Sequence, residues 1–130
     1  MATGLSNLKV YTLAEQLELE VHEFAKMFPR EERYRSVDQL LRSSSATTSN
    51  IAEAYKKQSV KEKVHILQSI VVCEAEETKS NLIRCGKKNL CDPQTANDTA
   101  ERYHGLIKAV QGYIRFLKAT ARKTEELTNR

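Results

Sequence analysis

Along four successive segments of the sequence, apolar residues recur at steps of three and four. This spacing places the apolar side chains of each segment on one face of an α-helix. Pro29 separates the first segment from the second, because proline fits the first turn of a helix but not its interior. The first segment, about Asn7 to Met27, is predicted to be an amphipathic helix with inward residues Leu8, Tyr11, Ala14, Leu17, Val21, Phe24 and Phe28.

The second segment is predicted to be one helix although its centre is polar. The run from Ser43 to Asn50 contains few helix-forming residues, and its hydroxyls compete for backbone hydrogen bonds, so propensity alone indicates a break. A continuous helix is favoured because the apolar face keeps its phase on both sides of the run. Small polar side chains there suit close helix contact or a buried hydrogen-bond network. The apolar face comprises Tyr34, Val37, Leu40, Leu41, Ile51 and Tyr55.

Capping signals delimit the third and fourth segments. Ser59 and Glu62 form a capping-box pattern, and Gly86 predicts a left-handed stop at the end of the third helix. Asp92 and Pro93 predict the N-cap and the first residue of the fourth helix. The inward residues are predicted to be Val60, Val64, Leu67, Ile70, Val71, Leu82 and Cys85, then Tyr103, Leu106, Ile107, Val110, Tyr113, Ile114, Leu117 and Ala121.

Short connections join the four predicted helices, so consecutive helices are expected to be antiparallel neighbours. A chain of 130 residues, 40% of them hydrophobic, has enough apolar surface for one core. The sequence therefore predicts an all-α, antiparallel up-down four-helix bundle that forms a single domain over residues 1–130.

The cysteines and the hydropathy pattern bear on the compartment. Cys73, Cys85 and Cys91 are odd in number and include no CxxC pair, so neither a disulfide framework nor a zinc site is indicated. No apolar stretch approaches the roughly 20 residues of a membrane span, and the first residues lack the pattern of a signal peptide. We expect a cytoplasmic protein without a membrane partner.

Patterns for catalysis or metal binding are weak. Glu101 and His104 have the spacing found in di-iron carboxylate bundles, but such sites need two of these motifs and further carboxylates. The predicted apolar face also leaves His104 off the inward direction. Neither a nucleophile-histidine-acid arrangement nor a glycine-rich phosphate loop is present. We expect a non-enzymatic protein with no metal and no cofactor.

Positive charge is concentrated after Pro29. The formal net charge is +4, yet the first 29 residues carry two lysines against four glutamates. An uninterrupted basic stripe on the fourth helix indicates phosphate binding, and a solvated face is the alternative. The stripe has no interleaved aromatic residue, which favours contact with the nucleic-acid backbone over reading of bases. The candidate nucleic-acid-binding residues are Lys108, Arg115, Lys118 and Arg122, followed by Arg30, Arg33 and Arg35 at the start of the second helix.

Small residues recur every seven positions on the fourth helix, at Gly105, Gly112 and Ala119. Small side chains lower helix propensity but let another helix approach closely. The favoured interpretation is a packing face within the chain, and the alternative is a contact between subunits.

A polar structural network is expected in the second helix. Arg42, Asn50 and Glu53 are predicted to be wholly or partly buried and hydrogen-bonded as a structural network. Glu74 and Glu77 fall at the edge of the third helix's apolar face. Because buried carboxylates need partners, Arg42 and Arg84 are the candidates to pair with them.

The second segment also carries a recognisable motif, FPREERYRSVDQLLRSSSATTSNIAEAY. It resembles the signature of the bacterial four-helix-bundle family named for proteins encoded within intervening sequences of 23S ribosomal RNA genes. Thr47 and Thr48 stand where that family usually has isoleucine and proline, and Ala54 replaces its glycine. The matching residues are Phe28, Pro29, Glu31, Glu32, Tyr34, Gln39, Leu40, Arg42, Asn50, Ile51, Ala52 and Glu53.

The resemblance implies a four-helix bundle, and one branch of similar bundles implies a function. That branch is the accessory variability determinant of diversity-generating retroelements, a homopentameric ring that binds nucleic acid and the element's reverse transcriptase. The expected function is therefore a non-enzymatic accessory protein that binds RNA or DNA through phosphates, as a subunit of a homo-oligomer that assists the reverse transcriptase of a diversity-generating retroelement. The alternative is a stand-alone structural or scaffold oligomer of the intervening-sequence type, whose partner is unknown.

Overall fold

Four helical rods make up the computed structural model, which describes residues 4–129. The first rod is α1 (Lys9–Ala25), preceded by the 3-10 turn η1 (Leu5–Asn7). The second joins the 3-10 turn η2 (Arg30–Glu32), the π-helical turn η3 (Arg33–Val37) and α2 (Asp38–Lys56). The third joins α3 (Val60–Ile66), the π-helical turn η4 (Leu67–Val71) and α4 (Val72–Lys87), and the fourth is α5 (Pro93–Thr128).

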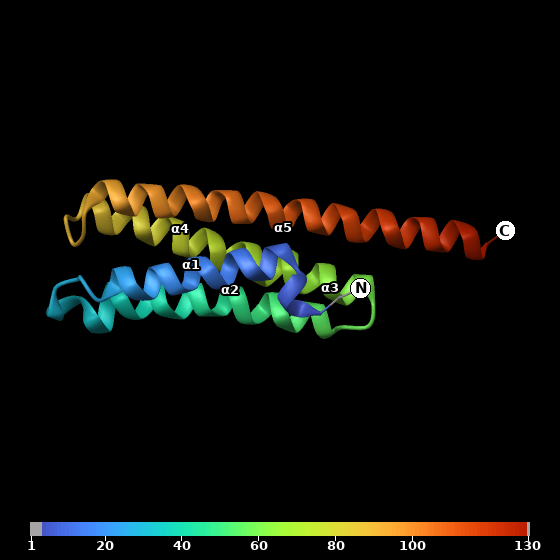
Figure 1. Ribbon diagram of the computed structural model, residues 1–130, viewed down its shortest axis with the longest axis horizontal. Coiled ribbons are helices and arrows are strands. Elements are labelled where there is room, and N and C mark those ends of the chain that lie inside the picture. The colour runs from blue at the N-terminus through green and yellow to red at the C-terminus, as the bar shows by residue number, and fades with distance from the viewer. Residues whose placement is uncertain (1–3, 130) are drawn as a thin grey trace.

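The rods run up and down in turn, so that each is antiparallel to the next (Figure 1). Contacts between α1 and α2, α2 and α4, α4 and α5, and α5 and α1 close the bundle. The prediction of an all-α, up-down four-helix bundle is confirmed.

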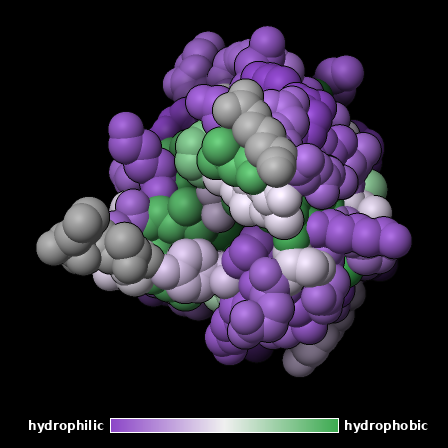
Figure 2. Space-filling view, turned by 90° about the vertical axis from the view of Figure 1, so that its right-hand side faces the viewer, coloured by the Kyte–Doolittle hydropathy of each residue, from purple (hydrophilic) through white to green (hydrophobic). Residues whose placement is uncertain are grey.

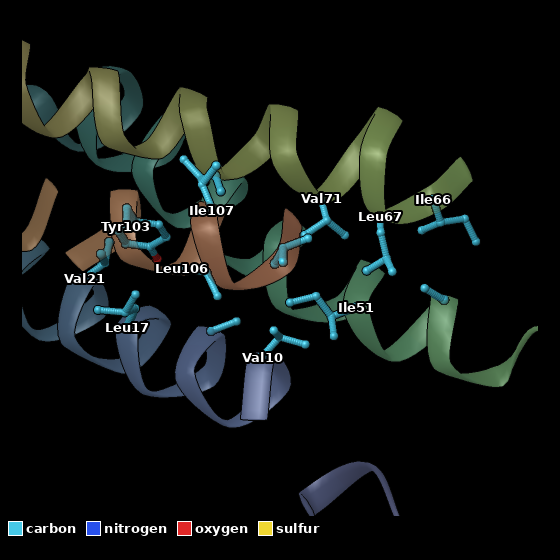
Figure 3. Close-up of a cluster of buried hydrophobic side chains, with 14 of the residues drawn as sticks. Val10, Leu17, Val21, Ile51, Ile66, Leu67, Val71, Tyr103, Leu106 and Ile107 are labelled. Carbon is cyan, nitrogen blue, oxygen red and sulfur yellow. The ribbon is translucent and has the colours of Figure 1, made fainter. Parts of the chain in front are cut away.

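All four rods contribute to the core (Figure 3). The inward residues follow the predicted steps of three and four, since the burial of their apolar surface is the main favourable term in folding. Burying one large aliphatic side chain stabilises a fold by about 1.5–3 kcal/mol. Fully buried members of the core include Leu17, Val21, Leu40, Ile51, Leu67, Val71, Leu82, Tyr103, Leu106 and Val110.

The polar centre of α2 is an unbroken helix, as predicted. Ser43, Thr47 and Thr78 are buried where α2 meets α4. The Thr78 hydroxyl donates to Ser43 Oγ at 2.6 Å, and Thr47 Oγ1 donates to the Ser43 carbonyl at 2.8 Å. Small hydroxyl side chains therefore give both of the expected effects, a close helix contact and a satisfied buried hydrogen bond.

Tyr34 was predicted to face inward, and that prediction is wrong. Its side chain is 85% exposed. The cause is the π-helical turn from Arg33 to Val37, because a wider turn shifts every earlier residue out of phase with the 3.6-residue period of α2. The aromatic ring of Tyr34 is thereby presented to solvent.

Gly86 was also predicted wrongly, as a left-handed helix stop. The residue with a left-handed backbone is Asn89, with φ of 58°. The Asn89 and Leu90 amides donate to the carbonyls of Gly86 and Cys85 at 3.0 and 3.1 Å, which is the Schellman arrangement. Gly86 instead permits close packing against the start of α5, because a Cβ atom there would lie 3.2 Å from Pro93 Cα.

Both predicted helix starts are confirmed. The Glu62 amide donates to Ser59 Oγ at 3.1 Å, and the Thr95 amide donates to Asp92 Oδ2 at 3.0 Å. The Thr95 hydroxyl also donates to Asp92, and these bonds lower the pKa of the Asp92 carboxyl. Hydrogen bonds to the charged form of a carboxyl have this effect.

Arg42, Asn50 and Glu53 do not form one network, which corrects the prediction. The Arg42 guanidinium is half exposed and pairs with Glu74 at 3.2 Å and with Glu77. Asn50 Nδ2 donates to the Ala46 carbonyl of its own helix at 2.8 Å, and Glu53 is exposed, 3.5 Å from Lys57 Nζ. Eleven residues of helix separate Arg42 from Glu53 by about 16 Å, which is too far for contact.

Candidate nucleic-acid interface

The inward face of α5 determines where its basic residues point. Tyr103, Leu106, Val110, Ile114 and Leu117 are buried at the predicted spacing. The basic side chains occupy other positions of the same helical period, so they project away from the core. All four of the predicted residues on this helix are exposed: Lys108, Arg115, Lys118 and Arg122. We call these four residues the α5 basic stripe.

No member of the α5 basic stripe forms an ion pair with a residue that the structure describes, although Glu125 and Glu126 line one pocket with Arg122. Ion pairs between described residues involve Lys26, Arg42, Lys57, Lys79 and Arg102. None of them includes a member of the stripe. Four unpaired cations on one helix face produce a local positive potential that attracts phosphate groups.

The C-terminal turns of α5 extend past the turn that joins α2 to α3 (Figure 1). Leu117 is the last fully packed residue of α5, since every later residue of this helix that the structure describes is more exposed. The view onto this end shows hydrophilic side chains around the rim and hydrophobic ones between the rods (Figure 2). Lys118 and Arg122 therefore lie on a helical projection that solvent or a partner surrounds.

The arginines of the second rod lie at the opposite end of the molecule, beside the turn between α1 and α2 (Figure 1). Arg30 and Arg33 line a pocket of about 230 Å³ that includes His22 and Lys26. Arg35 lines a different pocket, together with Arg84 and Lys88. The structure does not bring the two predicted basic groups together, because the antiparallel rods place them at opposite ends of the bundle.

The stripe of small residues on α5 is not a packing face within the chain, which corrects the favoured interpretation. A Cβ atom on Gly105 would meet no described atom within 4 Å. Gly112 faces only the guanidinium of Arg115 on its own helix. Phe116, beside this stripe, is 62% exposed and stacks on Tyr113 with ring centroids 6.4 Å apart. The small residues thus leave an open helical surface, as the alternative of a subunit contact requires.

The motif of Glu101 and His104 gathers no metal ligands. His104 Nδ1 lies 3.4 Å from Lys79 Nζ, so a cation is its nearest polar neighbour. No group of three His, Cys, Asp or Glu side chains suited to a metal ion occurs within residues 4–129. The helices described for this chain also include none that is long and apolar enough to cross a membrane.

The sequence matches the family described as "23S rRNA-intervening sequence protein" over residues 6–112. The chain belongs to this family. A solved structure from Bacteroides thetaiotaomicron is similar in fold, with a TM-score of 0.74 and 21% sequence identity over 81% of this chain and 97% of that one. That protein is described as one of unknown function from the S23 ribosomal protein family. None of the curated proteins compared with this sequence matches it.

The residues matched to the family include only one of the four members of the α5 basic stripe. Lys108 lies within the matched residues, whereas Arg115, Lys118 and Arg122 follow them. The inference drawn for the last three residues therefore rests on this chain's own geometry. The family description and the solved structure name no activity, substrate or catalytic residue.

Proposed function

We propose that this protein is a non-enzymatic, cytoplasmic accessory protein that binds RNA or DNA through phosphates. The observation that carries the proposal is the α5 basic stripe, whose four cations are exposed and have no acidic partner among the described residues. Lys108 and Arg122 are 14 positions apart, which is about 21 Å along a helix and enough to follow several phosphates of one strand.

Backbone contact fits this surface better than reading of bases. The aromatic rings of Tyr113 and Phe116 stack on each other beside the small residues and are not interleaved with the cations. Recognition of single-stranded bases normally uses aromatic side chains within the basic groove. Binding through the α5 basic stripe should therefore depend little on nucleotide sequence.

A homo-oligomer would turn the stripe into a multivalent surface. The open small-residue stripe and the exposed Phe116 supply a face that a second copy could cover. The resemblance to the retroelement branch of similar bundles implies a closed ring of five copies. In a ring, each copy would contribute its four cations to the same strand, which strengthens binding without any new kind of contact.

Within this function, we assign the protein as a subunit that holds template RNA or complementary DNA near a reverse transcriptase of a diversity-generating retroelement. This assignment rests on the sequence resemblance. A reverse-transcriptase gene and a near-identical template repeat beside the gene support it, and their absence favours a stand-alone scaffold oligomer.

The first prediction is that binding weakens steeply with salt. Each neutralised phosphate contributes a slope of about −0.9 for duplex or about −0.7 for single strands in log K against log salt. Four cations per chain therefore predict a slope of at least about −3 for a single-stranded 20-mer. Filter binding of two 20-mers of unrelated sequence between 50 and 200 mM NaCl measures this, and the two should differ less than threefold. Binding that does not change with salt would contradict the proposal.

The second prediction concerns assembly. Sedimentation should show a closed homo-oligomer, and for five copies a mass of about 74 kDa, five times the 14.8 kDa of one chain. Gly105→Glu should dissociate it, because a charged side chain would block the approach of a second helix. The same change leaves the isolated chain no less stable, since a Cβ atom on Gly105 would meet no described atom within 4 Å beyond the adjacent backbone of α5, and glycine is a poor helix former.

Gln68→Glu adds the same charge at an exposed position of the third rod and is the matched control. It should leave the sedimentation of the protein unchanged. A parent protein that sediments as a monomer, or a Gly105→Glu variant that assembles as the parent does, would remove the assembly proposed for α5.

A further inference from the structure

A second basic site lies at the end of the bundle remote from the tip of α5. Because α2 and α4 are antiparallel, the start of the second rod meets the end of the third there (Figure 1). The two rods border a pocket of about 300 Å³. Its lining residues are Tyr34, Arg35, Ser36, Gln39, Asn81, Arg84, Cys85 and Lys88.

The lining carries three cations and no carboxylate. The Arg84 guanidinium is held by Asn81 Oδ1, which fixes its position at the pocket. Neither Arg35 nor Lys88 takes part in any ion pair formed within residues 4–129. Like charges around one small volume repel each other, and an anion in that volume would relieve the repulsion. The guanidinium groups also match the geometry of phosphate oxygens.

A neighbouring acid offsets only part of this charge, and the thiol offsets none of it. Glu32 lies outside the lining, and its Oε1 accepts a hydrogen bond of 2.8 Å from Ser36 Oγ. Cys85 is buried, and burial raises the pKa of its thiol, so the sulfur stays protonated and neutral at pH 7. Three cations in the lining against the one neighbouring carboxylate of Glu32 leave the pocket with a net positive charge.

Tyr34 gives the pocket an aromatic edge. The π-helical turn η3 holds its side chain 85% exposed at the rim. An exposed ring next to a cationic pocket is suited to stacking against a nucleobase whose phosphate occupies the pocket. Gln39 and Asn81 add side-chain amide donors around the same volume.

We propose that this pocket binds the terminal phosphate of a nucleotide, with the base against Tyr34. Three cations favour a phosphomonoester, which carries a charge of about −1.5 to −2 at pH 7, over the single charge of a phosphodiester. The site is distinct from the α5 basic stripe and does not depend on it. A free nucleoside monophosphate and the 5′-phosphorylated end of a strand share this chemistry.

The test is calorimetric titration of the full-length protein with AMP, adenosine, inorganic phosphate and a tetranucleotide with or without a 5′-phosphate. AMP should bind at least tenfold more tightly than adenosine, and about tenfold more tightly than inorganic phosphate, because base stacking contributes about 1–3 kcal/mol. A 5′-phosphorylated strand that binds as tightly as AMP identifies a strand end as the ligand, and a weaker one identifies the free nucleotide.

Substitutions test the cations that would bind the phosphate separately from Tyr34, which would stack on the base. Arg84→Gln and Lys88→Gln should each weaken AMP binding at least tenfold. Lys87→Gln, at an exposed neighbour outside the pocket lining, is the matched control and should have no effect. Tyr34→Leu should weaken AMP binding while leaving that of inorganic phosphate unchanged.

Two results would overturn the proposal: AMP binding no tighter than adenosine, or equal losses from Lys87→Gln and Lys88→Gln. The glutamine variant of Arg115, Lys118 and Arg122 should still bind AMP as the parent does. These measurements therefore distinguish a stripe that does not bind nucleic acid from a pocket that does not bind a nucleotide.

Discussion

Replacing Arg115, Lys118 and Arg122 with glutamine is expected to weaken binding of single-stranded nucleic acid about 100-fold near 0.1 M salt. The estimate follows from three lost phosphate contacts at about −0.7 each in the salt slope, which amounts to about two powers of ten at that concentration. The slope itself should fall by about 2. The loss should be similar for unrelated sequences, since phosphate contacts carry no sequence information.

The fold should survive this change because all three side chains are exposed and none forms an ion pair with a described residue. Circular dichroism and the denaturation midpoint check this. Replacing Arg115 and Arg122 with lysine keeps the charge and is the matched control, with affinity within a few-fold of the parent. A triple variant that binds as tightly as the parent, with the same salt slope, would contradict the assignment of this site to α5. It would indicate instead that nucleic acid binds at Arg30, Arg33 and Arg35.

The bundle could be predicted from the sequence because the spacing of apolar residues and the burial of helix faces express the same physical rule. The steps from Val10 through Ala14, Leu17 and Val21 show this, as do those from Tyr103 to Leu117 in α5. The rule is least reliable where the backbone departs from 3.6 residues per turn, although it still held for Leu67 and Val71 in η4. The apolar spacing therefore placed Tyr34 wrongly in the core. The π-helical turn η3 rotates this side chain away from the apolar face, and the residue types of the segment do not predict such a turn.

Helix ends and polar clusters depended on contacts that spacing does not encode. Gly86 carries the residue type of a left-handed stop, yet packing against Pro93 required a small side chain there and Asn89 took the left-handed backbone. Arg42 found Glu74 and Glu77 across the interface with α4, as predicted, rather than Asn50 or Glu53 along its own helix. Contacts between different helices therefore determined both the end of α4 and the partners of Arg42.

The two candidate sites differ in the same respect. The exposure of the α5 basic stripe could be predicted from one helix, because an apolar face on one side leaves cations on the other. The pocket of Arg35, Arg84 and Lys88 joins residues about 50 positions apart in the sequence. Only the antiparallel arrangement of the second and third rods shows that their charges share one volume.

Tyr103→Ala is expected to destabilise the fold by about 3–5 kcal/mol, since truncating a large buried aromatic side chain loses its burial and leaves a cavity. Tyr103 is fully buried in the core, beside Leu17 and Val21 of α1 (Figure 3). Its hydroxyl has no hydrogen-bond partner among the described residues. Tyr103→Phe keeps the ring and removes that hydroxyl, so it should be neutral or stabilising by up to about 1–3 kcal/mol.

The pH dependence of the free energy of unfolding distinguishes a buried Tyr103 hydroxyl from a solvated one. Burial, and next the charges of Glu18 and Glu20, raise the pKa of Tyr103 in the folded state above the value of about 10 expected in the unfolded chain. Above pH 10 the unfolded chain therefore releases a proton that the folded chain retains, and stability falls by up to about 1.4 kcal/mol per pH unit. The Phe variant lacks this group, while Tyr11 and Tyr113 titrate in both proteins. Urea unfolding at pH 8 and pH 11 should show the advantage of Tyr103→Phe growing by about 1 kcal/mol, whereas an advantage that stays constant would place the Tyr103 hydroxyl in water.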